Sequence, residues 1–105
     1  MGPRFALAVF TMLGAAVVGA PSAKERARAV LKAQRCGSCH DSAVSTENPR
    51  ALAVYDLLEP DWPARMSDAQ LPKLLSRLKS APAADQKTVR ELVAAELKAR
   101  AADRR

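Results

Sequence analysis

The sequence predicts an all-α fold in one small domain. The chain has 105 residues, a length that excludes doubly wound sheets, barrels and multi-domain enzymes. Apolar residues recur at helical spacing in several segments, and no useful stretch alternates with a period of two. Aromatic residues make up only 4% of the chain, so its core needs another large apolar body. We therefore expect three to four short helices packed around a bulky apolar group.

Residues 1–23 have the three-part layout of a secretory signal peptide. Arg4 precedes an uncharged apolar run of 14 residues that begins at Phe5, and small residues follow the run. The run is shorter than the roughly 20 residues that a spanning helix needs, so we expect no stable membrane insertion once the segment is removed. We predict cleavage after Ala23, with a cut after Ala20 as the alternative. The mature chain is then periplasmic or otherwise exported.

The mature domain is predicted to span residues 24–105 and to open with an amphipathic helix over 24–34. Ala27, Val30 and Leu31 recur there at helical spacing, and charged residues occupy most of the other positions. This pattern places one apolar stripe against the rest of the domain.

A second, shorter helix is predicted from Pro49 to about Leu58. Asn48 is a favourable N-cap, and Pro49 is a favourable first helical residue. The proline-containing residues 59–65 are predicted to form an extended loop.

Two more helices are predicted in the C-terminal part. One runs from near Leu71 to Ser80, although Pro72 favours a later start. The last has Asp85 as its cap and a surface pair of Glu96 and Arg100 four residues apart. Each is identified by apolar residues on one face: Leu71, Leu74, Leu75 and Leu78 in the first, and Val89, Leu92, Val93 and Leu97 in the second.

The most specific motif is the pentapeptide Cys36-Gly37-Ser38-Cys39-His40. Cys-x-x-Cys-His is typical of c-type haem attachment. Two thiols three residues apart can reach the two vinyl groups of one porphyrin, and the next side chain is then directed at the iron. Gly37 and Ser38 are small enough to let the ring edge approach the backbone.

Three other interpretations of the pentapeptide stay open. A dithiol redox site needs its cysteine pair at the start of a helix after a strand, and here the pair follows a helix. Zinc needs four ligands, so Asp41 or Glu47 would have to complete the set. A plain structural disulfide is chemically possible in an exported chain.

With this motif, the chain resembles the small monohaem c-type cytochromes of the class I type. The likeness covers an export signal, a helix leading into Cys36–His40, a long loop region, a methionine and a C-terminal helix. It implies an all-α, cytochrome c-like bundle of three to four short helices around one covalent haem. Haem c would be attached to Cys36 and Cys39, with His40 as the proximal axial ligand and the first helix packed on the last.

The sixth iron ligand is the least determined part of the resemblance. Met66 is the candidate, but it precedes two predicted helices rather than one and lacks a flanking proline. The alternative for Met66 is packing on Leu71 as a hydrophobic staple. The chain has a single histidine, so the other options are Lys73, Tyr55, water or an open position. A Met/His pair suits electron transfer, whereas an open site suits gas or peroxide chemistry.

Several residues are candidates for holding the haem propionates. Trp62 can donate its indole N–H, and Arg50 and Arg65 flank the same loop. Ordinary packing of Trp62 and solvation of the two arginines are the alternatives.

The predicted function is a non-enzymatic, exported carrier of single electrons. Sixteen basic and eleven acidic residues follow Ala23, which favours redox partner proteins with acidic docking surfaces. The alternatives are a haem-c ligand-binding or sensing domain with an open distal site, and a haem-free exported dithiol protein. Nucleic-acid binding is not expected, because acidic residues interrupt the basic ones on each helix.

Overall fold

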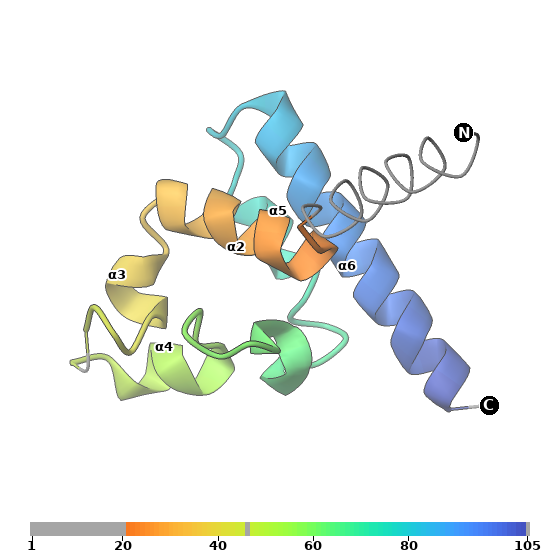
Figure 1. Cartoon of the computed structure of the whole chain (residues 1–105), viewed down its shortest axis with the longest axis horizontal. Helices are drawn as coiled ribbons and strands as arrows, with labels where there is room; N and C mark the ends of the chain where they lie inside the picture. Colours follow the sequence, from red (N-terminus) through yellow and green to blue (C-terminus); the bar gives the residue numbers. More distant parts are fainter. Residues whose placement is uncertain (1–20, 46, 105) are drawn as a thin grey trace, which may run out of the picture.

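The computed structural model describes residues 21–45 and 47–104, and every regular element in those ranges is helical (Figure 1). The all-α class is therefore confirmed. The predicted signal peptide falls mainly on residues 1–20, outside the described part. No helix within the described ranges has the length and apolar character to cross a membrane. The elements are α2 (Ala23–Ala33), α3 (Gly37–His40), α4 (Pro49–Val54), the 3₁₀ helix η1 (Trp62–Arg65), α5 (Lys73–Ser76) and α6 (Ala83–Asp103).

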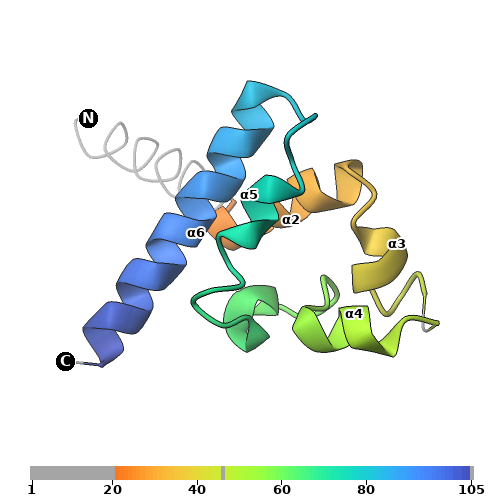
Figure 2. The same ribbon diagram turned by 180° about the vertical axis from the view of Figure 1, so that it is seen from behind.

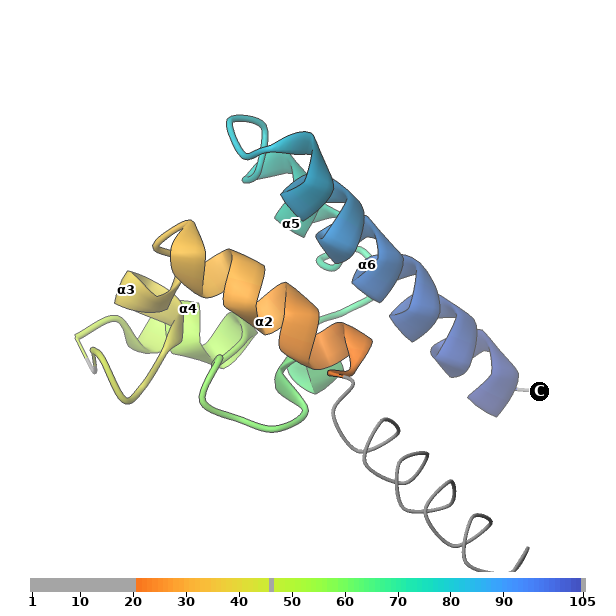
Figure 3. The same cartoon turned by 45° about the horizontal axis from the view of Figure 1, so that its top comes forward.

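The fold is organised around the packing of α2 on α6, and the expected contact of first and last helices is confirmed (Figure 3). Seen from behind, α5 also lies along α6 (Figure 2). α3 packs on α4 and follows the C-terminal end of α2. One apolar cluster joins these parts, and its fully buried members include Leu31, Leu57, Trp62, Leu71, Leu78, Val89 and Leu92.

Helix α2 matches its predicted range to within one residue. Ser22 is its N-cap, and the Ser22 side chain accepts a hydrogen bond of 3.2 Å from the Glu25 N–H. The predicted stripe of Ala27, Val30 and Leu31 is the buried face. Local propensity and tertiary burial agree here, which is why the sequence locates the helix well.

The connection from α2 to α3 is a tight turn that directs the first cysteine. The Cys36 N–H donates to the Leu31 carbonyl at 2.9 Å, and the Arg35 N–H donates to Lys32 at 3.0 Å. These are the two bonds of a Schellman motif. Its left-handed position is Arg35, with φ at 65°. The chain therefore leaves one helix and enters the next with no intervening loop.

The middle of the chain departs from two predictions. Helix α4 ends at Val54 rather than near Leu58, because the Leu57 N–H bonds to the His40 carbonyl at 2.6 Å and draws the chain into extended form. The predicted extended loop over 59–65 contains η1, whose Pro63 has the φ required by a first helical turn.

The predicted helix from Leu71 to Ser80 is reduced to the four residues of α5. Pro72 has no N–H for a helical bond, and the flanking residues form three-residue turns, such as Leu74 N–H to Leu71 carbonyl at 3.1 Å. The leucines remain buried, since three of the four predicted positions are in the core: Leu71, Leu74 and Leu78.

Asp85 does not cap α6, contrary to the prediction. The helix begins at Ala83 with Pro82 as N-cap, and Asp85 lies in the first turn. A carboxylate there still interacts favourably with the helix dipole. The turn before α6 is closed by Gln86, whose side chain donates to the Leu78 and Ala81 carbonyls at 3.0 Å each.

The left-handed backbone at Arg35 predicts a stabilising substitution. Arg35→Gly removes the steric penalty of a β-carbon at this φ, so we expect the free energy of unfolding to rise by about 0.5–1 kcal/mol. Urea denaturation followed by circular dichroism measures the change. Arg35→Ala is the matched control, because it removes the charge but keeps the β-carbon. A gain of equal size in both variants would attribute the effect to charge.

Candidate functional site

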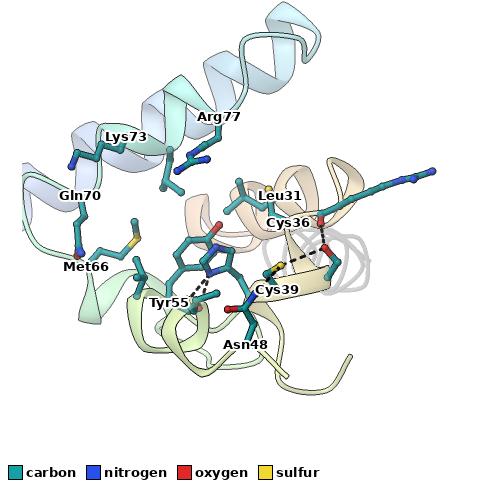
Figure 4. A pocket seen from close by; sticks show the side chains of 15 residues that line it. Leu31, Cys36, Cys39, Asn48, Tyr55, Met66, Gln70, Lys73 and Arg77 are labelled. Carbon is teal, nitrogen blue, oxygen red and sulfur yellow. Dashed lines mark hydrogen bonds between the residues drawn. The ribbon is translucent and has the colours of Figure 1, made fainter. Parts of the chain in front are cut away.

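The C-terminal end of α2, together with α3, α4 and α5, borders a cavity of about 470 Å³ that is open to solvent on one side (Figure 4). This volume lies within the range of roughly 300–1,000 Å³ that is usual for small-molecule and cofactor sites. All four predicted site residues line it: Cys36, Cys39, His40 and Met66. The lining is completed by Leu31, Arg35, Ser38, Asn48, Ala51, Val54, Tyr55, Gln70, Lys73, Leu74 and Arg77.

The two cysteines are free thiols. Cys36 is the N-cap of α3, so the pair starts a short helix as well as following a longer one. Burial nevertheless raises the pKa of the Cys36 thiol, although the Tyr55 hydroxyl acts in the opposite direction. Near Cys39, the side-chain amide of Asn48 donates to the sulfur at 3.5 Å.

That amide contact explains a further departure from the sequence prediction. Asn48 precedes α4 as expected, but its side chain makes no capping bond. The residue instead links the start of α4 to α3 through the Cys39 sulfur. No local pattern identifies such a contact, because it depends on how α3 and α4 pack.

His40 is oriented by two backbone carbonyls. Its Nδ1 lies 2.8 Å from the Ala51 oxygen and 3.3 Å from the Tyr55 oxygen. A carbonyl oxygen only accepts hydrogen bonds, so Nδ1 carries the hydrogen and Nε2 of the neutral ring keeps its lone pair. A backbone carbonyl of this kind fixes the tautomer of metal-binding histidines. The imidazole is therefore prepared to act as a ligand through Nε2.

The Tyr55 ring stacks on the imidazole. The centroids of the Tyr55 and His40 rings lie 3.9 Å apart with an angle of 6° between planes, and Trp62 packs on Tyr55 with centroids 5.6 Å apart. Burial raises the pKa of the Tyr55 hydroxyl, which therefore stays neutral at ordinary pH. Because Tyr55 lies beside His40 rather than across from it, this arrangement does not suit Tyr55 as a second axial ligand.

Met66 approaches the cavity from another direction. Figure 4 shows Met66 and Gln70 on one side of Tyr55 and the two cysteines on the other. Met66 is 4% exposed and belongs to the same buried cluster as Leu71. The Met66 side chain therefore lines the cavity and also packs in the core, and its predicted role as an axial ligand stays a prediction. Lys73, the other candidate, also lines the cavity.

The expected propionate residues lie elsewhere. Trp62 is fully buried, and its N–H donates to the Lys24 carbonyl at 3.1 Å, so Trp62 takes the alternative of ordinary packing rather than the candidate role at a propionate. η1 turns the indole toward the start of α2. Arg65 pairs with Glu59, and neither Arg65 nor Arg50 lines the cavity. The cavity cations are Arg35, Lys73 and Arg77, all exposed.

The zinc alternative required Asp41 or Glu47 beside the cysteines and histidine. Asp41 instead forms an ion pair of 3.7 Å with Lys32. Within residues 21–45 and 47–104, no three side chains of His, Cys, Asp or Glu are grouped so that they could hold a metal ion.

The loop after His40 is fastened by the carboxylate of Asp56. Its Oδ1 accepts hydrogen bonds of 3.0 Å from the Ser42 and Leu58 backbone N–H groups. Burial opposes the charged form, but hydrogen bonds from Ser42 and Leu58 outweigh it and lower the pKa of Asp56. The carboxylate therefore ties the segment after His40 to the segment after Tyr55.

No family model, curated protein or solved structure matches this chain. The site is therefore interpreted from its own geometry. Two free thiols, a tautomer-fixed imidazole and a thioether share one largely apolar cavity. This donor set fits a haem held by two thioether bonds and an axial histidine.

Asp56→Asn should weaken the protein and change its response to acid. The asparagine oxygen can still accept from both N–H groups but carries no charge, so the free energy of unfolding is expected to fall by about 1 kcal/mol at neutral pH. The lowered pKa of Asp56 means that its contribution is present above 3.8 and is lost as pH falls through the native value. Urea titrations at several pH values should show a flatter acid dependence in the variant. Asp103→Asn, at the exposed end of α6, is the control, and equal slopes in both variants would contradict the role of Asp56.

Proposed function

We propose that this chain is an exported monohaem c-type cytochrome that carries single electrons between redox partners. The observation that carries the proposal is the Nδ1 contact of His40 with the Ala51 carbonyl at 2.8 Å, beside two free thiols in one cavity. When bound, haem c supplies one-electron transfer at its iron.

Each residue of the Cys36–His40 motif has a separate role in holding the proposed haem. Cys36 and Cys39 supply the thiols for two thioether bonds, and the Schellman turn keeps Cys36 at the cavity wall. His40 offers Nε2 as the proximal donor, because Nδ1 is occupied by backbone carbonyls. Tyr55, packed on the imidazole face, limits rotation of the ring and keeps water from it.

Met66 is the proposed distal ligand. It lies in the cavity on the other side of Tyr55 from the cysteines, in a buried setting that excludes water (Figure 4). A thioether opposite an imidazole raises the reduction potential and closes the site to small ligands. Both properties suit a carrier better than a sensor.

The rim of the cavity supports a partner with acidic docking groups. Arg35, Lys73 and Arg77 are exposed there and belong to a chain with a formal charge of +6. Opposite charges on a redox partner would speed encounter and favour a short-lived complex.

The haem-free dithiol alternative receives less support. A reactive dithiol cysteine has a lowered pKa, whereas burial raises the pKa of Cys36 even though it lies at the start of α3. The open-site sensor remains the alternative if Met66 serves only in packing.

Covalent attachment is tested by expression with a cytochrome c maturation system. We expect a coloured product whose chromophore survives acid-acetone extraction, since two thioether bonds hold it. The double variant Cys36→Ala, Cys39→Ala should lose nearly all of this chromophore, while Ser38→Ala within the same motif should keep it. A colourless product from the unaltered chain would overturn the proposed function.

Ligation by Met66 is tested with Met66→Leu, which keeps most of the packing volume but removes the sulfur. We expect loss of the near-red absorption band of the ferric protein and carbon monoxide binding to the reduced protein at least tenfold faster, because the distal site opens. Lys79→Ala, at an exposed position outside the cavity lining, should change neither reading. An unchanged spectrum in Met66→Leu would restrict Met66 to packing and favour the sensor.

A further inference from the structure

The segment from Glu59 to Met66 has few backbone donors of its own. Pro60 and Pro63 carry no N–H. The Pro63 carbonyl accepts locally from the Met66 N–H at 3.0 Å, whereas the Glu59, Pro60 and Met66 carbonyls receive hydrogen bonds from side-chain donors. Side chains from the two long helices provide them. On α2, Arg28 donates to the Glu59 carbonyl at 2.7 Å and to the Pro60 carbonyl at 3.2 Å.

Arg100 of α6 holds the other end of this segment. Its Nη1 donates to the Met66 carbonyl at 2.6 Å, and its Nη2 donates to the Pro63 carbonyl at 3.0 Å. One planar guanidinium thus spans the last turn of η1 and the residue that follows it. The Met66 side chain lines the cavity, whereas Arg100 does not.

The Arg100 guanidinium also donates hydrogen bonds to two carboxylates. Arg100 Nε donates to Glu96 at 3.3 Å, and Nη1 also donates to Asp68 at 3.0 Å. The Arg100 side chain is only 19% exposed. Asp68 in turn binds Arg104 at 3.2 Å, in an exposed contact. The predicted surface pair of Glu96 and Arg100 is confirmed as a pair, but it is half-buried and serves a larger network.

We infer that Arg100 is the positioning residue that holds the Met66 thioether in the distal site. The inference rests on the proposed function, and it adds a residue that contacts neither the cavity nor its contents. Arg100 holds the backbone at Pro63, within η1, and at Met66, directly after it. The backbone that carries the Met66 side chain is therefore fixed in position. Without the two carbonyl bonds the segment moves away more easily, and Met66 leaves the iron more often.

The test compares Arg100→Lys with Arg104→Lys in the haem-loaded protein. A lysine keeps the charge but has one nitrogen, so it cannot place separate nitrogens on the two carbonyls as the planar guanidinium does. We expect Arg100→Lys to keep covalent haem and helical content, to weaken the ferric near-red band, and to bind carbon monoxide about tenfold faster, given the loss of two charge-assisted bonds. Arg104 contacts Asp68 alone, so Arg104→Lys should leave both readings unchanged.

A double variant separates positioning from general loosening. In Met66→Leu the distal site is already open, so adding Arg100→Lys should give no further increase in the rate of carbon monoxide binding. A further increase would mean that Arg100 acts on the fold as a whole, and it would overturn the inference. If Arg100→Lys does not fold, Asp68→Asn, which loosens one support of the guanidinium, should give a smaller change in the same direction. Unchanged readings in Asp68→Asn would also contradict the positioning role of Arg100.

The remaining outcomes distinguish the two proposals. Haem bound with an intact near-red band, and identical rates in Arg100→Lys and the unaltered protein, would remove the role of Arg100 and leave the cytochrome assignment standing. Covalent haem in an unaltered protein that lacks the ferric near-red band would also remove the role of Arg100, because Met66 would then not be a ligand. Absence of a covalent chromophore in the unaltered chain would overturn both.

Discussion

The site depends on one hydrogen bond, from His40 Nδ1 to the Ala51 carbonyl. That bond selects the tautomer and leaves Nε2 as the free ring nitrogen. It forms because α4, which contains Ala51, packs on α3, which contains His40. The Leu57 N–H binds the carbonyl of the histidine, and the Asp56 carboxylate binds the backbone N–H of Ser42, two residues later. A donor atom is thus positioned by three backbone contacts, each supplied by a residue far along the chain. On the proposed function, this support would hold the ring of a single axial histidine in one orientation.

Sequence reasoning located the elements whose local signals agree with their burial. The stripe of α2 and that of α6 are long enough for periodicity to identify them. The segment between Asn48 and Ser80 could not be predicted equally well, because tertiary contacts decide its form. Asn48 has the chemistry of a cap but bonds to a sulfur, and Leu71 is buried although its segment is mostly turns. Short segments rich in proline have weak preferences, so packing determines their conformation.

The site residues could be predicted for a different reason than the helices. Cys36, Cys39 and His40 could be predicted to lie together because they are close in sequence, and all three line the cavity. The roles of Trp62 and Arg100 were not, since nothing in a one-dimensional pattern tells a buried indole which carbonyl it will meet. The scarcity of aromatic residues was informative in another way. Among the described lining residues, Tyr55 is the one Phe, Tyr or Trp side chain, and it borders a cavity of about 470 Å³.

Arginines supplement the short 3₁₀ helix in the segment that carries Met66. The carbonyls of Glu59 and Met66 accept from guanidinium groups in part-buried contacts, and the Pro63 carbonyl accepts from Arg100 in addition to the Met66 N–H. Arg28 and Arg100 satisfy those carbonyls from two helices that already pack on each other. Each guanidinium has five donors in a fixed plane, so it can join two carbonyls and still reach a carboxylate. The packing of α2 on α6 therefore also fixes the distance between the two ends of the loop. On the proposed function, these arginine contacts and the packing of α2 on α6 would together keep the Met66 thioether in place.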